Sequence, residues 1–88
     1  MGNCTHLVFG IHVSDRVKEA GAVQGLLTEY GCSIRTRIGL HQVSEGACAS
    51  GGLILLEMFG DPAVCRELKT KLANVEGVEV QEMIFEHD

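Results

Sequence analysis

Hydrophobic and polar positions alternate with a period of two near the N-terminus of this chain. Residues 6–13 have the sequence His-Leu-Val-Phe-Gly-Ile-His-Val, in which every second side chain is strongly apolar. These apolar residues are Leu7, Phe9, Ile11 and Val13. Because successive side chains of a strand point to opposite faces, the pattern predicts a strand with one buried face.

The apolar spacing then changes to that of a helix. The apolar residues that share one helical face are Ala20, Val23, Leu26, Leu27 and Tyr30. Ser14 and Asp15 offer the capping chemistry of a helix start, so we expect a helix over residues 15–30. Gly31 follows it, at the place where a left-handed C-terminal cap is expected.

Alternation returns in the middle of the chain. One side of the next predicted strand has Ile34, Thr36, Ile38 and Leu40, and the other has Ser33, Arg35, Arg37, Gly39 and His41. The second set predicts a polar, basic row. Residues 42–51 are rich in small side chains and are expected to form a mobile loop. In residues 53–59 both the odd and the even positions are largely apolar, which is typical of a central strand covered on both faces.

A second helix and a last strand complete the pattern. Asp61 and Pro62 are a capping carboxylate and a first-turn proline, and the helix is expected to end near Asn74. Its apolar stripe consists of Val64, Cys65, Leu68, Leu72 and Val75. Residues 78–85 alternate, but the apolar positions change phase, which suggests a β-bulge near Glu82.

The predicted order is therefore β-α-β-β-α-β over one domain, residues 1–88. This order is typical of the α+β class with a ferredoxin-like fold, a four-stranded antiparallel sheet with two helices on one face. The other face would be uncovered, although several of its side chains are apolar. We expect a second copy of the chain to cover that face, as a homodimer or a larger oligomer. A sheet with some exposed aliphatic side chains remains the alternative.

Composition limits the partners and the location of the protein. The 88 residues include 7 basic and 12 acidic side chains, with a net charge of −5, so direct nucleic-acid binding is not expected. No apolar run has the length of a membrane span, and no secretory segment is found at the N-terminus. A cytoplasmic location is expected.

The cysteines give no metal or disulfide pattern. Cys4, Cys32, Cys48 and Cys65 contain no C-x-x-C pair, and we expect all four to be reduced thiols, two of them in or near the core.

Two groups of residues could hold a small anionic effector. Free N–H groups at the first helix start would lie near Ser14, Asp15 and Arg16, and an arginine favours a carboxylate or phosphate there. Arg35, Arg37 and His41 form the basic row of the second strand and could bind an anion or an acidic protein partner. Solvated charges on an edge strand are the alternative for this row.

A resemblance adds to this picture. The stretch Leu26–His41 contains Thr-Arg-Ile-Gly-Leu-His, and it is followed after the loop by Gly-Leu-Ile-Leu-Leu-Glu at residues 52–57. These segments resemble the iron-only hydrogenase system regulators, and the layout resembles ACT-type regulatory domains. The resemblance implies an intracellular, dimeric, non-catalytic module whose effectors bind between the first strand, the first helix and a partner subunit. It also implies kinship with the metal-responsive half of nickel-dependent repressors.

Regulation by an effector is thus the expected function, and two alternatives stay open. One is a metal-responsive sensor for Ni or Fe that uses His41 and Cys48, with His6 and His12 as further imidazoles. The other is an assembly module without a ligand. Catalysis is not expected, since no nucleophile and base pattern stands out, and the cofactor is unknown.

Overall fold

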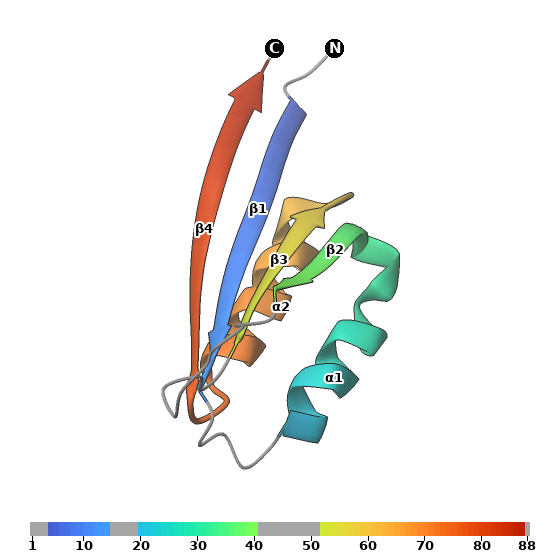
Figure 1. Ribbon diagram of the computed structural model, residues 1–88. Coiled ribbons are helices and arrows are strands. Elements are labelled where there is room, and N and C mark those ends of the chain that lie inside the picture. The colour runs from blue at the N-terminus through green and yellow to red at the C-terminus, as the bar shows by residue number, and fades with distance from the viewer. Residues whose placement is uncertain (1–3, 15–19, 41–51, 88) are drawn as a thin grey trace.

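The computed structural model describes residues 4–14, 20–40 and 52–87, and within them it has four strands and two helices (Figure 1). The elements are β1 (Cys4–Val13), α1 (Ala20–Glu29), a short 3-10 turn η1 (Gly31–Ser33), β2 (Ile34–Leu40), β3 (Gly52–Met58), α2 (Pro62–Ala73) and β4 (Val78–His87). The sheet order is β2-β3-β1-β4, and every neighbouring pair is antiparallel. The α+β, ferredoxin-like fold predicted from the sequence is confirmed.

The core lies between the sheet and the two helices. From the first strand, Leu7, Phe9 and Ile11 are buried, as the alternating pattern predicted. The other buried apolar residues are Val23 and Leu27 of α1, Leu56 and Met58 of β3, and Cys65, Leu68, Leu72 and Val75 in or just after α2. Both helices therefore pack on one face of the sheet, and the even positions of β1 face away from them.

The start of α2 follows from two adjacent residues. The Asp61 carboxylate accepts a hydrogen bond from the Ala63 N–H at 2.9 Å, and Pro62 is the first residue of the helix, where its missing N–H costs nothing. The helix ends at Ala73 with Asn74 as its C-cap, in agreement with the predicted end near Asn74. Val64 is the one residue of the predicted stripe that is not in the core, with an exposure of 36%.

The predicted bulge near Glu82 is wrong. Residues of β4 pair with β1 without a shift, from Val78 opposite Val13 to His87 opposite Cys4. The apolar positions of β4 do change from even to odd residue numbers. Because the register has no bulge, the later apolar side chains lie on the face opposite to the helices. Val80 lies on the helix side, opposite Ile11, whereas Met83 lies on the open side, opposite Val8.

The register irregularity occurs instead in β2. Ile34 pairs with Met58 and Thr36 with Glu57, so Arg35 is an extra residue in the ladder. Side chains before and after it consequently change faces: Ile34 packs against the core, while Ile38 is exposed opposite Leu55.

Gly31 is not a left-handed cap. The described glycines with positive φ are Gly60 and Gly77, whereas Gly31 begins the turn η1. The Ser33 N–H donates to the Tyr30 carbonyl at 2.9 Å, so a 3-10 turn satisfies the end of α1 in place of a glycine cap. The predicted start of α1 at residues 15–19 and the loop at residues 42–51 lie outside the described residues.

Replacing Asp61 by Ala should destabilise the protein by about 1 kcal/mol, because the N–H of Ala63 loses its acceptor. Urea unfolding followed by circular dichroism measures the change. Asp61→Asn keeps a side-chain oxygen at the cap and should lose much less. Equal losses in the two variants would contradict the capping role.

Candidate functional site

The most extensive candidate site is the face of the sheet that the helices leave uncovered, which we call the open face. Its described residues come from all four strands and follow from the register. They are Thr36 and Ile38 of β2, Leu53, Leu55 and Glu57 of β3, His6, Val8, Gly10 and His12 of β1, and Glu79, Gln81, Met83 and Phe85 of β4.

A hollow lies at the centre of the open face. One row of the sheet consists of Ile38, Leu55, Gly10 and Gln81, and Gly10 contributes no side chain to it. The hollow has a volume of about 440 Å³ and is lined mainly by apolar atoms of Val8, Leu53, Leu55 and Met83. A Cβ atom at Gly10 would lie 3.7 Å from Leu55 Cδ2, an ordinary contact. The sheet itself therefore does not require glycine at this position.

A second hollow continues from the first toward β2. It has a volume of about 360 Å³ and shares Val8 and Leu55 with the central hollow. Its other open-face residues are His6, Thr36, Ile38, Glu57 and Phe85. The open face is thus a continuous apolar surface, and its concave centre could receive protruding side chains.

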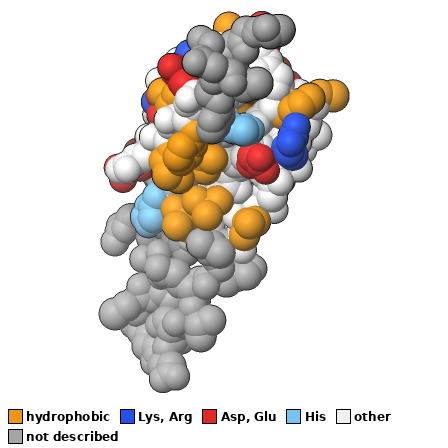
Figure 2. All heavy atoms as spheres, turned by 90° about the horizontal axis from the view of Figure 1, so that it is seen from above, with side chains coloured by type: hydrophobic (Ala, Val, Ile, Leu, Met, Phe, Trp, Pro, Cys, Tyr) orange, Lys and Arg blue, Asp and Glu red, His pale blue; other side chains and the backbone are white. Residues whose placement is uncertain are grey.

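Polar side chains lie along the border of this apolar surface. Thr36 donates a hydrogen bond to Glu57 at 2.9 Å, and His12 stands opposite Glu79 in the ladder. Figure 2 shows hydrophobic side chains gathered beside histidine side chains on one surface of the molecule. An apolar centre with a polar rim is the usual composition of a protein interface.

The two arginines of β2 do not form the single row that the sequence predicted. Arg35 lies over the ring of Phe59, with its guanidinium carbon 4.7 Å from the ring centroid. Arg37 donates to the side chain of Gln24, on α1, at 2.8 Å. The reason is the extra residue in the ladder at Arg35, because the alternation of side chains between the two faces is interrupted at this position. His41, the third residue of the row, lies outside the described residues.

Arg35 borders a separate hollow at one end of the sheet. This hollow has a volume of about 320 Å³, and its lining residues are Thr5, His6, Arg35, Met58, Phe59, Gly60 and Pro62. Arg35 has no ion pair with any carboxylate in the described part of the chain. A guanidinium over an aromatic ring still has N–H donors for another partner, so this hollow suits a small anion.

The other predicted anion site is only partly described. The backbone N–H of Ser14 donates to the carbonyl of Gly77 at 2.9 Å, whereas Asp15 and Arg16 lie outside the described residues. Ser14 follows the end of β1, whereas Arg35 borders a hollow with Thr5 and His6, near the start of that strand. Ser14 and Arg35 therefore do not belong to one site within a single copy.

No metal site is found in the described part of the chain. No three of its His, Cys, Asp or Glu side chains come close enough to hold an ion. His6 and His12 share a face of β1 but are six positions apart, which is roughly 20 Å along a strand. Cys48 and His41, the predicted ligands, lie outside the described residues.

The described cysteines differ in their surroundings. Cys32 is exposed, whereas Cys65 is buried in the core with its sulfur 3.7 Å from the Phe59 carbonyl. Burial raises the pKa of the Cys65 thiol above its usual value, and a backbone hydrogen bond with Phe59 only partly offsets this effect. Cys65 is therefore an inert core residue, and it does not support a thiolate site.

Met83 and Phe85 were not predicted from the sequence as members of the open face. Their signal was present, because the apolar positions of the last strand change parity after Val80. The same change is compatible with a bulge, but in the unbroken register of β4 it produces exposed apolar side chains on the open face.

Comparisons with known proteins support the fold over the whole chain. No family model and no curated protein matches this sequence. The structure of the uncharacterized protein TM1266 from Thermotoga maritima is similar, with a TM-score of 0.75 and 25% identity. The match covers 96% of this chain and 99% of that chain.

A second similar structure is the apo form of CPII from Thiomonas intermedia K12, a nitrogen regulatory PII-like protein. Its TM-score is 0.44 at 12% identity, with 99% of this chain and 98% of that chain covered. This level of similarity gives no information about a ligand or an assembly of the present chain. The link to iron-only hydrogenase systems stays a prediction. In the described residues no helix is long and apolar enough to cross a membrane.

Alkylation should separate the two described thiols. In the folded protein at pH 8, iodoacetamide should modify Cys32 readily and Cys65 only after unfolding, because Cys65 is both buried and held as a thiol. Because the pKa of Cys65 is higher in the folded form than in the unfolded chain, the contribution of this group to stability should fall as the pH rises above 9.0, the usual pKa of a thiol. Peptide mass spectrometry measures the first effect. Equal rates at both sites would contradict the burial of Cys65.

Proposed function

We propose that this chain is a non-catalytic regulatory module that works as a homodimer or larger oligomer, in which a second copy covers the open face. A small anionic effector would bind the assembled protein and shift its preference for a protein partner. The hydrogenase system suggested by the sequence resemblance is the proposed setting. The observation that carries this proposal is the apolar, concave open face.

The size of the open face supports a second copy as its cover. Burial of one large aliphatic or aromatic side chain contributes about 1.5–3 kcal/mol, and a small domain has a total stability of only about 5–15 kcal/mol. Six large apolar side chains lie on this face, namely Val8, Ile38, Leu53, Leu55, Met83 and Phe85. Their burial in an interface therefore would be a large term for a chain of 88 residues.

The hollow beside Arg35 supports an anionic effector. Its guanidinium is positioned by Phe59 and has no carboxylate partner in the described part of the chain. Arg37, by comparison, is engaged by Gln24. Ser14, Asp15, Arg16 and His41 remain proposed members of the effector site, to be completed by the partner subunit. An effector regulates only if it binds one arrangement of the subunits better than another.

Leu55→Glu should lower the mass of the assembly, because it places a carboxylate beside the central hollow. Sedimentation velocity at micromolar concentration measures the mass. Val64→Glu is the matched control, since it makes a similar change at an exposed position of α2 and should leave the mass unchanged.

Circular dichroism should show that both variants are folded. The proposal for the open face fails if the unmodified chain already sediments as a 9.5 kDa particle, or if Leu55→Glu leaves the larger mass intact.

Small carboxylates and phosphates should raise the melting temperature if one of them is the effector. A ligand at 100 times its Kd stabilises the folded form by about 2.7 kcal/mol, which a thermal shift detects. Arg35→Ala should remove this shift, and Arg37→Ala should keep most of it, because Gln24 already occupies Arg37. Equal responses in the two variants, or none in a broad panel, would contradict the effector site at Arg35.

A further inference from the structure

The outer edge of β4 lacks the bulge, the proline and the short length that often prevent edge-to-edge pairing. The strand runs from Val78 to His87 with an unbroken register, and its sequence contains no proline. The opposite edge, β2, is shorter and is interrupted at Arg35. Natural edge strands are commonly protected by bulges, prolines or short length. Of the two edges of this sheet, β4 is therefore the one that can accept another strand.

Three consecutive apolar side chains lie exposed on this edge strand. Met83, Ile84 and Phe85 have exposures of 52%, 43% and 49%. Since they alternate, Met83 and Phe85 lie on the open face and Ile84 on the helix side. Figure 1 shows that β1 and β4 extend beyond β3 at this end, where Ile84 pairs with Leu7. Exposed apolar groups on both sides of one strand favour a partner strand over solvent.

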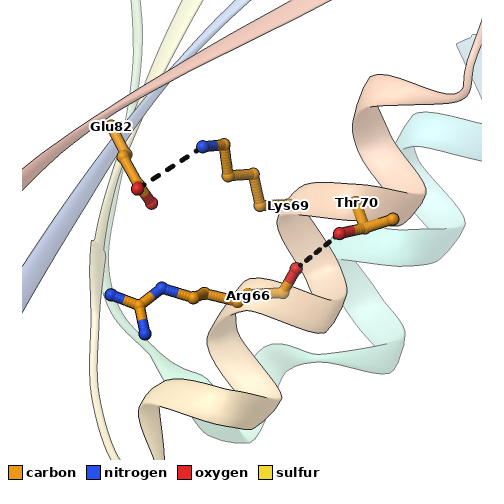
Figure 3. A network of polar contacts seen from close by, with 4 residues as sticks. All are labelled: Arg66, Lys69, Thr70 and Glu82. Atoms are coloured by element: carbon orange, nitrogen blue, oxygen red, sulfur yellow. Dashed lines mark hydrogen bonds and ion pairs between the residues drawn. The ribbon is translucent and has the colours of Figure 1, made fainter.

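Glu82, near the middle of β4, faces the helices and forms an ion pair with Lys69. The Nζ atom of Lys69, on α2, lies 3.5 Å from Glu82 Oε2, and Figure 3 shows the lysine extending from the helix to the strand. A charge that points inward on an edge strand usually opposes the approach of a second sheet. Here Lys69 offsets that charge, so Glu82 does not protect the edge.

We infer that β4 pairs antiparallel with β4 of a second copy, about a two-fold axis at Met83, and that the two sheets form one continuous sheet. A two-fold axis perpendicular to the sheet places one residue opposite its own copy. With Met83 at this position, Glu82 stands opposite Ile84, Gln81 opposite Phe85 and Val80 opposite Glu86. Glu79 stands opposite position 87, a histidine.

Charge selects this register from its neighbours. Like charges directly opposite each other destabilise a strand pair. An axis at Glu82 would place Glu82 opposite itself, and an axis at Ile84 would place Glu82 opposite Glu86. An axis at Gln81 leaves Phe85 beyond the paired strand, and an axis at Phe85 pairs residues 83–87 alone. The axis at Met83 pairs no glutamate with glutamate and covers all three exposed apolar residues.

This contact differs from the one in the proposed function and does not depend on it. Pairing of β4 uses the edge of the sheet, whereas the proposed regulatory dimer uses its open face. Met83 belongs to both surfaces, since its backbone lies on the edge and its side chain lies on the open face. The two contacts together would build a closed assembly of four chains where their two-fold axes intersect at right angles.

Disulfide trapping tests the register directly, in a background with Cys4, Cys32 and Cys48 replaced by Ser and the buried Cys65 kept. Met83→Cys should form a covalent dimer on oxidation, because opposed residues have Cα atoms about 4.5–5.5 Å apart, within the roughly 4.4–6.8 Å range of disulfides. Gln81→Cys and Phe85→Cys should each stay single, since each lies roughly 13 Å from its own copy. A mixture of these two variants should form the covalent dimer.

Non-reducing electrophoresis measures the outcome, with the background protein as the blank. Failure of Met83→Cys to crosslink, or equal crosslinking by Gln81→Cys alone, overturns the inference. Adding Leu55→Glu to Met83→Cys separates the two contacts: crosslinking should persist although the open face is disrupted. Loss of the covalent dimer in this double variant would show that no independent edge contact exists. A change of mass in Leu55→Glu without trapping at Met83 would leave the proposed function standing while the edge pairing falls.

Discussion

Burial of one face of the sheet under α1 and α2 is the interaction on which the rest of this structure depends. Phe9, Ile11 and Leu56 are completely buried from the sheet side, and Leu68 and Leu72 of α2 meet them from the helix side. Both crossovers of a β-α-β-β-α-β chain are right-handed, which places both helices on the same face. Among the described residues, no element therefore covers the second face, whatever its side chains are.

The open face and the outer edge of β4 are two consequences of this single-layer cover. Val8, Leu53 and Leu55 would be ordinary core residues if a further layer lay above them, and the hollow at Gly10 would be filled. Instead they form a continuous apolar surface that meets the edge of the sheet at Met83. A chain of this size can gain further burial mainly by association with other chains, so assembly and regulation are physically linked in our proposal.

Charge is distributed so that it leaves these apolar surfaces open. Lys69 and Glu82 pair on the helix side, Arg37 binds Gln24 on α1, and Arg35 stacks on Phe59 at the end of the sheet. One irregular residue in β2 is responsible for the separate positions of the two arginines. A ligand at Arg35 would consequently contact the end of the sheet, where β1 continues past β3.

Periodicity along the chain was sufficient to predict the element order, the buried face of β1 and the cap of α2 at Asp61, because these depend on neighbours a few residues apart. Alternation in residues 6–13 and the Asp-Pro pair need no distant partner to be interpreted. Periodicity could not predict the irregular register at Arg35 or the unbroken register at Glu82. The same shift in the apolar positions can arise from a bulge or from a change of the face that carries the apolar side chains. Only pairing with β3 and β1 decided between them, and that pairing joins segments far apart in the sequence. The composition of the open face, and with it the candidate site, was decided at that tertiary level.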